Sequence, residues 1–410
     1  MYFANATVGT PPQSVRLHID TGSSDLWLNT PKSDLCLTGE DICETAGVYS
    51  ANSSSTYSYV SSDFNISYVD GSGAAGDYAT DTVAIGSASL KGLQFGIGYE
   101  SSSSEGILGI GYAVNEVQVA RFGKAPYENL PAKLAANSMI QSNAYSLWLN
   151  DLDTNTGSIL FGGVDKAKYI GSLETLPIQR RGESFAEFLI SLTGVGLDGN
   201  PIAQNLAQAV LLDSGSSLTY LPDAITEAIY QKLNAQYSAE DGVAFVPCSL
   251  ANSDSTLDFT FSSPTIKVPM NELVITIPST TGRQLTFTDG TPACLFGLSP
   301  AGSMPSVFGD TFLRSAYVVY DLENNEISLA QTNFNSTGTN VVEIASGTSG
   351  VPDATLVADS VAATVGAATA ARTSTAGIGE LSRVSKADHV LPCFLSVVAG
   401  TGFIMLYLVT

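Results

Sequence analysis

Histidine is almost absent from this sequence, because the 410 residues include only His18 and His389. Serine and cysteine nucleophiles are usually activated by a histidine base, and catalytic zinc sites commonly use histidine ligands. His18 lies inside an apolar run, His389 lies near the chain end, and no His-Glu-x-x-His pattern occurs. The sequence therefore gives no support to the triad and zinc-hydrolase arrangements, and we expect no metal and no other cofactor.

Basic residues are also few, with 17 Lys and Arg against 39 Asp and Glu and a net charge of −22. No basic run is present that could neutralise phosphates, which argues against nucleic-acid binding. The acidity has two explanations that the sequence leaves open. It provides solubility in an acidic medium, or it marks an acidic cleft that attracts basic peptides.

Only five cysteines occur, and one of them, Cys393, stands alone in an apolar C-terminal tail. The other four form one pair that is close in sequence and one pair that is further apart: Cys36 and Cys43, and Cys248 and Cys294. These spacings favour one local and one longer disulfide, which form in an oxidising compartment. Four Asn-x-Ser/Thr sequons are candidate glycosylation sites: Asn5, Asn52, Asn65 and Asn335. We therefore expect a secreted, extracellular protein.

Short apolar runs separated by Gly, Ser, Asn and Asp turns fill residues 1 to about 333. Clear strand patterns are 15–19, 272–277 and 317–320. Helical patterns are few and are limited to 128–140 and 222–237. The fold is predicted to be mostly β with a few short helices.

Two stretches of the sequence repeat each other. An apolar run ends in Asp20-Thr21-Gly22-Ser23-Ser24, and a second apolar run ends in Asp213-Ser214-Gly215-Ser216-Ser217. Each is followed, at a similar distance, by an apolar-Gly segment, meaning two apolar residues and a glycine: Ile107-Leu108-Gly109 and Val307-Phe308-Gly309. An Asp-containing motif and an apolar-Gly segment thus occur twice at similar spacing. This repetition predicts a duplicated lobe, with one Asp contributed by each copy.

Asp20 and Asp213 are the candidate catalytic residues. Each ends an apolar run and is therefore partly desolvated, and each precedes a turn whose glycine lets backbone N–H groups approach. Two carboxylates a few ångströms apart share one proton, so one can act as general base on a water while the other polarises a carbonyl. Hydroxyls that can support the carboxylates or brace the two loops are Thr21, Ser23, Ser214 and Ser216.

With these motifs, residues 2–333 resemble the pepsin-like aspartic proteases, peptidase family A1, whose dyad is the standard example of proton sharing between carboxylates. The resemblance implies a bilobal fold of two homologous β lobes with a cleft between them, the N-lobe spanning about 1–165 and the C-lobe about 166–333. It implies that the two apolar-Gly segments thread beneath the catalytic loops. It also implies disulfides Cys36–Cys43 and Cys248–Cys294.

Residues 66–76 contain an Asp-Gly turn and predict a β-hairpin. The hairpin is similar to the flap that closes over substrate in this family. Tyr68 falls at the position of the flap tyrosine, and Trp27 at a position whose indole N–H can hold the tyrosine hydroxyl; core packing is the alternative for either aromatic. The resemblance implies substrate backbone contacts at Gly22, Gly71, Ser72, Gly215 and Ser217.

The composition changes after Asn335. Residues 334–376 are rich in Ser, Thr and Ala and are expected to form a disordered stalk. Residues 377–410 combine a polar spacer with an apolar tail, which is the pattern of a GPI-anchor signal that is removed on processing. A membrane-spanning tail is the alternative. The stalk and the anchor signal resemble those of the fungal yapsin-like members.

We therefore expect a monomeric, secreted aspartic endopeptidase, made as a zymogen, that hydrolyses peptide or protein substrates at acidic pH. A glycolipid anchor is expected to hold it at the plasma membrane or cell wall. The alternative is a catalytically silent pepsin-like binding or cell-wall protein, although such relatives usually lose an Asp or damage the flap. A glycoside hydrolase also uses paired carboxylates, but it does not predict two matched Asp-x-Gly-Ser loops.

Overall fold

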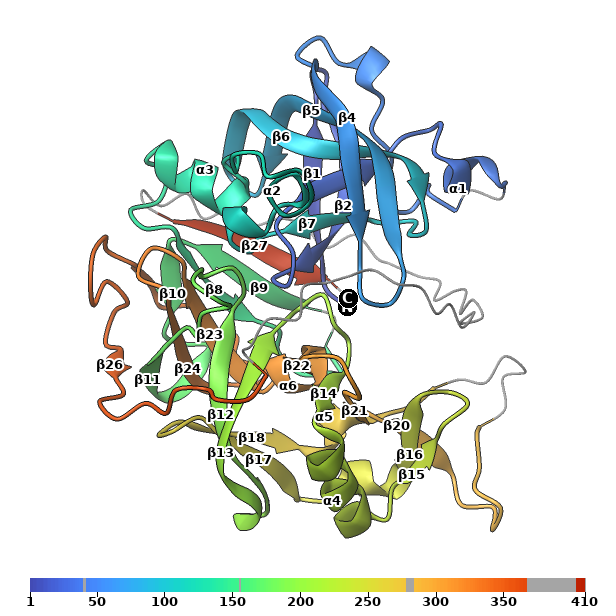
Figure 1. The fold of residues 1–410 in the computed structure, drawn as a ribbon, viewed down its shortest axis with the longest axis vertical. Helices are drawn as coiled ribbons and strands as arrows, with labels where there is room; N and C mark the ends of the chain where they lie inside the picture. Colours follow the sequence, from blue (N-terminus) through green and yellow to red (C-terminus); the bar gives the residue numbers. More distant parts are fainter. Residues whose placement is uncertain (40–41, 155, 278–283, 367–402, 410) are drawn as a thin grey trace.

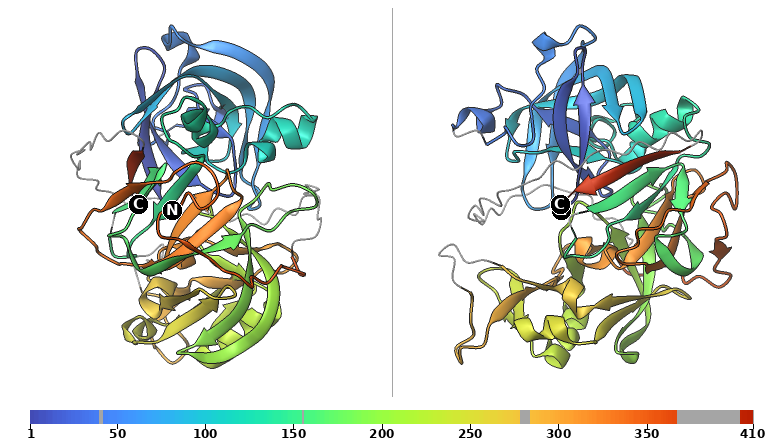
Figure 2. Two further views of the ribbon diagram at one scale, coloured as in Figure 1. Left: turned by 90° about the vertical axis from the view of Figure 1, so that its left-hand side faces the viewer. Right: turned by 180° about the vertical axis from the view of Figure 1, so that it is seen from behind.

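The computed structural model describes residues 1–39, 42–154, 156–277, 284–366 and 403–409. Its ribbon forms two β-rich lobes, one built mainly from the first part of the chain and the other from the second (Figure 1). Strand β27 (Ile404–Val409), drawn in red, lies between the two lobes, next to the N-terminus (Figure 2).

The elements follow the chain in this order. Up to residue 165 they are β1 (Phe3–Val8), β2 (Gln13–Asp20), β3 (Leu26–Asn29), α1 (Asp34–Leu37), β4 (Ser58–Ser67), β5 (Gly73–Ile85), β6 (Ala88–Ser101), β7 (Gly106–Gly109), α2 (Val117–Phe122), α3 (Leu130–Ala136), β8 (Ala144–Trp148), β9 (Thr156–Phe161) and β10 (Gly163–Asp165). From there to residue 275 they are β11 (Tyr169–Pro177), β12 (Leu189–Leu197), β13 (Asn200–Leu212), β14 (Thr219–Leu221), α4 (Asp223–Leu233), β15 (Gln236–Ser238), β16 (Val243–Pro247), β17 (Thr256–Thr260), β18 (Thr265–Pro269), α5 (Met270–Leu273) and β19 (Val274–Ile275). The remaining elements before β27 are β20 (Ala293–Phe296), β21 (Leu298–Pro300), β22 (Ser306–Phe308), α6 (Asp310–Leu313), β23 (Ala316–Asp321), β24 (Glu326–Thr332), β25 (Val341–Glu343) and β26 (Thr355–Leu356). Single 3-10 turns lie at Ala51–Ser53, Ala113–Asn115 and Cys248–Asn252.

The largest sheet joins the two lobes. The largest sheet has 14 strands in the order β26-β11-β24-β23-β8-β9-β27-β1-β2-β7-β3-β6-β5-β4, so it contains strands from both parts of the chain. A 7-stranded sheet (β18-β17-β12-β13-β22-β14-β21) and a 4-stranded sheet (β15-β16-β20-β19) form the second lobe. The mostly β, bilobal prediction is confirmed, whereas the lobe boundary at residues 165 and 166 stays a prediction.

Burial explains why the two Asp-containing strands end in apolar runs. In β2, Leu17 and Ile19 are fully buried, and β13 ends on the buried residues Val210 and Leu212. Both strand ends pair in parallel with another strand. Parallel strands that are covered on both faces are apolar at successive positions, instead of alternating between apolar and polar residues.

The secondary structure differs from the prediction at three places. Residues 270–273 form helix α5 instead of the start of a strand, since Pro269 stands at its N-cap, a position where proline is tolerated. Helix α4 ends at Leu233 rather than Tyr237 because Asn234 adopts a left-handed conformation with φ of 52°. Helix α3 is shorter than residues 128–140, with Asn129 as its N-cap.

The expected disorder of the stalk is wrong for residues 334–366. Strand β25 pairs with β10, and β26 pairs with β11. Ile344 is fully buried and Val351 is 6% exposed in a cluster with core residues. The segment has few apolar residues of its own. It is ordered by backbone hydrogen bonds to existing strand edges and by these two buried apolar side chains. Residues 367–376 lie outside the described residues.

The end of the predicted anchor signal forms strand β27. It pairs along its whole length with β9, and its last residue pairs with Phe3 of β1. Ile404, Leu406 and Leu408 are buried. These residues therefore occupy a strand position in the sheet, and the removal of the signal on processing stays a prediction. Residues 377–402, including Cys393, lie outside the described residues. In the part of the chain that the structure describes, no helix is both long and apolar enough to cross a bilayer.

Candidate active site

Parallel strand pairs position the two candidate carboxylates. Strand β2 lies beside β7, with Asp20 opposite Gly109. Strand β13 lies beside β22, and the backbone N–H of Asp213, just beyond the strand, donates to Phe308 O at 3.0 Å. The two apolar-Gly segments therefore lie beside the two Asp-containing strands.

Each carboxylate is held by its own loop in the same way. The N–H of the glycine two residues later donates to one carboxylate oxygen, at 2.8 Å in both loops. The hydroxyl of the serine three residues later donates to the other oxygen. The donors are Gly22 and Ser23 for Asp20, and Gly215 and Ser216 for Asp213.

The two glycines also let the loops approach each other. A Cβ atom on Gly22 would lie 2.5 Å from Asp213 Oδ1, and one on Gly215 would lie 2.4 Å from Asp20 Oδ1. Real side chains do not tolerate such distances, so glycine is required at both positions. The approach brings the carboxyl groups of Asp20 and Asp213 within hydrogen-bonding reach of one another.

This proximity changes the proton affinity of Asp20, which is 5% exposed. Burial, followed by the nearby charge of Asp213, raises the pKa of Asp20 to about 7, although the Ser23 hydroxyl and the Gly22 N–H act in the opposite direction. A buried pair of like charges is unfavourable, so the pair retains one proton at acidic pH.

Buried hydrogen bonds brace the two loops against each other. Thr21 Oγ1 donates to Leu212 O at 2.9 Å and accepts from the N–H of Ser214 at 2.9 Å. Ser214 Oγ donates to Ile19 O at 2.9 Å, and the N–H of Thr21 donates to Ser214 Oγ at 3.2 Å. Thr21 and Ser214 therefore hold the loops in register from both sides, which is the bracing that the sequence suggested.

The predicted flap is a hairpin of β4 and β5. Its turn is closed by bonds from Tyr68 N to Ser72 O at 2.8 Å and from Gly71 N to Tyr68 O at 3.1 Å, with Gly71 at φ of 86°. The Trp27 indole N–H donates to the Tyr68 hydroxyl at 2.8 Å. Burial, followed by the charge of Asp20, raises the pKa of Tyr68, and the hydrogen bond from Trp27 acts in the opposite direction.

The predicted substrate-binding residues lie around the dyad and on the flap. Gly22 and Gly215 are in the two catalytic loops, and Ser217 is exposed two residues beyond Gly215. Gly71 and Ser72 are at the tip of the flap. Their contacts with substrate stay a prediction.

Sequence reasoning assigned no role to Asp25, although it stands within the first motif. Asp25 is 1% exposed and accepts hydrogen bonds from the hydroxyls of Tyr78 at 2.6 Å and Tyr127 at 2.9 Å and from Val117 N at 2.9 Å. Burial raises its pKa against the effect of these donors. Asp25 stands directly before the apolar run Leu26-Trp27-Leu28, and an acidic residue beside a buried strand is a sequence signal for a buried carboxylate.

A second unassigned acid, Glu116, lies next to this network. It is fully buried at the N-cap of α2, where its Oε2 accepts from Tyr127 N at 2.8 Å and its Oε1 has no hydrogen-bond partner. Burial raises the pKa of Glu116 to about 9; the Tyr127 N–H lowers it and the charge of Asp25 raises it further. Glu116 is therefore protonated in the folded protein at acidic and neutral pH.

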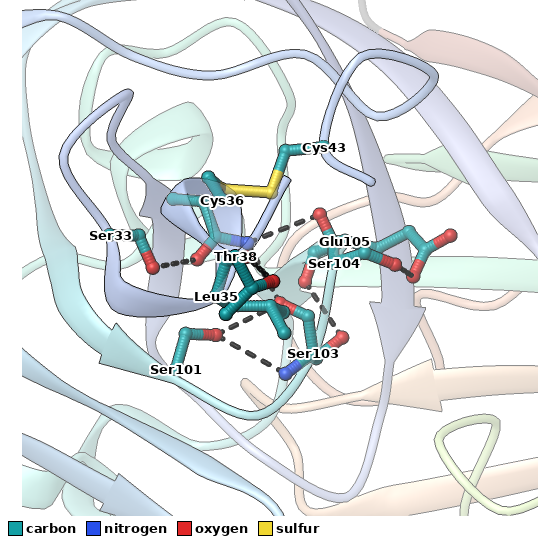
Figure 3. Close-up of a disulfide and its surroundings, with 10 residues drawn as sticks. Ser33, Leu35, Cys36, Thr38, Cys43, Ser101, Ser103, Ser104 and Glu105 are labelled. Carbon is teal, nitrogen blue, oxygen red and sulfur yellow. Dashed lines mark hydrogen bonds between the residues drawn. A yellow bond between two sulfur atoms is a disulfide. The ribbon is translucent and has the colours of Figure 1, made fainter. Parts of the chain in front are cut away.

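Both predicted disulfides are present. Cys36–Cys43 closes a loop that lies against residues 101–105, the segment that leads into β7 (Figure 3). Cys248–Cys294 links the short 3-10 turn at Cys248–Asn252 to β20 in the second lobe. The four predicted glycosylation sites, Asn5, Asn52, Asn65 and Asn335, are all exposed. Across residues 1–39, 42–154, 156–277, 284–366 and 403–409, no group of three or more His, Cys, Asp or Glu side chains is placed to hold a metal ion.

The family model for "Eukaryotic aspartyl protease" matches residues 1–332, which include both carboxylate loops and the flap. The chain belongs to this family. Similar proteins include the "Probable aspartic-type endopeptidase opsB" of Aspergillus fumigatus, 54% identical over 95% of this chain and 83% of that protein. The protein of the same name from Aspergillus oryzae is 56% identical over 91% of this chain and 77% of its own length. These matches show that the chain is an aspartic-type endopeptidase.

More distant relatives are named as acid or secreted proteases. "Secreted aspartic protease 6" of Candida albicans is 37% identical over 84% of this chain and 78% of its own length. Among solved structures, the aspartic proteinase of Irpex lacteus matches with a TM-score of 0.66 and 24% identity, over 82% of this chain and 96% of that one. This structural likeness supports the pepsin-like fold.

Proposed function

We propose that this endopeptidase hydrolyses peptide bonds with a water molecule held between Asp20 and Asp213. The observation that carries the proposal is the mutual approach of the two carboxyl groups, each fixed by a glycine N–H and a serine hydroxyl of its own loop. Hydrolysis of an amide needs a base for the attacking water and an acid for the carbonyl oxygen and the leaving nitrogen. A carboxyl pair that carries one proton supplies both.

Each residue has a role in this mechanism. The ionised carboxyl takes a proton from water as the oxygen attacks the carbonyl carbon, and the protonated one donates to the carbonyl oxygen. The acquired proton then goes to the leaving nitrogen as the C–N bond breaks. A hydroxyl of the tetrahedral intermediate returns its proton to the other carboxyl as the new carbonyl forms, which restores the pair to one proton. Thr21 and Ser214 keep the two carboxyls in register, and Tyr68 with Trp27 keeps the flap close to the dyad.

The proposed reaction has an acidic optimum. The pKa of Asp20 is raised to about 7, and the active form has one proton on the pair, so activity is lost as the pH rises through that value and the shared proton leaves. We expect the purified enzyme to cleave a denatured protein at pH 4 and to be inhibited by pepstatin. Absence of turnover after any prosegment has been removed would favour the catalytically silent binding protein instead.

We also propose that the enzyme is extracellular and is held at the cell surface by a glycolipid. The two disulfides, the exposed sequons and the secreted relatives support the location. The spacer and apolar tail of residues 377–410 support the anchor. Phosphatidylinositol-specific phospholipase C should release the enzyme from intact cells. Mass spectrometry that finds residues 403–409 still attached to the mature enzyme would disprove the anchor.

A further inference from the structure

Two basic residues at the end of helix α2 contact the outer strand of the flap. Arg121 Nη1 donates to Asn65 Oδ1 at 2.6 Å, and its Nη2 donates to Ser67 Oγ at 3.1 Å. Lys124 forms an ion pair with Asp63. With only 17 Lys and Arg in the whole chain, the use of two of them within four residues on one strand calls for a functional explanation.

The contacted residues share one face of strand β4. Asp63, Asn65 and Ser67 alternate with the buried residues Phe64 and Ile66, as expected for successive side chains on opposite faces of a strand. The buried face of β4 is therefore fixed by the core, and the outer face is fixed by α2. The flap turn begins at the residue directly after Ser67.

Helix α2 is itself anchored close to the active site. Its first N–H, that of Val117, donates to Asp25 Oδ2 at 2.9 Å, and Asp25 lies two residues before Trp27. The helix ends at Phe122 and is capped by Gly123, whose left-handed φ of 60° allows its N–H to donate to Val119 O. Lys124 follows directly after this cap. One short helix thus joins the segment that carries the flap partner Trp27 to the base of the flap.

From this geometry we propose that Arg121 is a positioning residue for peptide hydrolysis, with Lys124 as its supporting partner. Arg121 acts through Asn65 and Ser67 to hold the outer flap strand, so that Tyr68 stays over the dyad before substrate arrives. The proposal rests on the proposed function. A flap that is already held loses less conformational entropy when it closes on a peptide. The contact therefore lowers the free-energy cost of substrate binding.

The charges suit an acidic medium. A hydrogen bond from Lys124 is the largest of the effects that lower the pKa of Asp63, and the Ser61 hydroxyl acts in the same direction. Asp63 therefore remains ionised further into the acid range than an ordinary aspartate. Arginine stays charged at every pH of interest, and its two-pronged contact gives direction as well as charge.

The test compares Arg121→Ala, Arg121→Lys and the control Lys133→Ala. The control removes a similar surface ion pair, with Glu128, from the same lobe and away from the flap. All proteins are made in a bacterial host, which adds no glycan to Asn65. Charge-assisted hydrogen bonds at the surface predict a rise in KM of about 3- to 10-fold for Arg121→Ala, with kcat within about 2-fold of wild type. Arg121→Lys should recover part of the loss, and Lys133→Ala should change neither constant.

Amide hydrogen exchange in residues 66–74 gives a second readout that needs no turnover. Arg121→Ala should speed exchange of the flap by about 3- to 10-fold, and Lys133→Ala should not. Unchanged KM and unchanged flap exchange in Arg121→Ala would overturn the proposal, as would equal changes in Lys133→Ala. If Arg121→Ala fails to fold, Arg121→Lys decides by the same criteria. An inactive wild type would contradict the proposed function. The hydrogen-exchange rates would still test whether the contact between α2 and strand β4 holds the flap.

Discussion

Asparagine in place of either Asp20 or Asp213 is expected to lower kcat by about 10⁴-fold or more, because each change removes one half of an acid–base pair. Asparagine has nearly the same shape as aspartate: its amide oxygen can still accept from the glycine N–H, and its NH2 group can donate to the serine hydroxyl. It cannot hold the proton that the pair shares, and it cannot take a proton from water. The measurement is steady-state cleavage of a peptide substrate at pH 4.

The fold of these variants should survive, since the change removes a buried carboxyl that is costly to ionise. Thermal unfolding at pH 4 should therefore show a Tm at or above that of the wild type. Asp153→Asn provides the matched control, because Asp153 is exposed and outside the catalytic loops. More than about a tenth of wild-type activity in either dyad variant, or an equal loss in Asp153→Asn, would show that the dyad is wrongly assigned.

The catalytic loops could be predicted because their chemistry is local and occurs twice. Asp20 and Asp213 are each followed by the glycine and serine that bind them, so one short motif contains a carboxylate and its donors. The duplication then implied that the two motifs face each other. The distance between the loops depends on how both lobes pack, which no local pattern shows.

The network behind the flap could not be predicted in the same way. The partners of Asp25 come from 53 and 102 residues further along the chain, at Tyr78 and Tyr127. Such contacts are set by tertiary packing, and a single sequence gives no pattern that pairs them. The contact of Arg121 with strand β4 belongs to the same class.

The stalk was predicted wrongly for a physical reason that composition does not capture. A segment of small and polar residues has too little apolar surface to form a core of its own. It can still be ordered when open strand edges and apolar gaps already exist, as β25, β26 and the buried Ile344 show. The family model matches residues 1–332, so this ordered segment lies beyond the matched residues.

Glu116 is expected to make the folded protein less stable at neutral pH than at acidic pH. Its pKa is about 9 in the folded protein against an ordinary value of 4.5, so the folded state keeps a proton that the unfolded chain releases. A raised pKa contributes stability that is fully present below about pH 4.5 and is lost as the pH rises toward about 9. The loss is about 1.4 kcal/mol per pH unit within this window, or roughly 3 kcal/mol at pH 7.

Glu116→Gln should therefore leave the free energy of unfolding nearly unchanged at pH 4 and raise it by about 2–3 kcal/mol at pH 7. Glutamine is neutral at both pH values and its side-chain oxygen can still accept from Tyr127 N. Urea unfolding across pH 4 to 7 measures the effect, and Glu128→Gln, with Glu128 mostly exposed on the same stretch of chain, is the control. Equal pH dependence in wild type and Glu116→Gln would contradict the assignment. The variant also separates two causes of lost activity at high pH: if Asp20 sets the upper limit of catalysis, Glu116→Gln stays folded at pH 7.5 and still loses activity there.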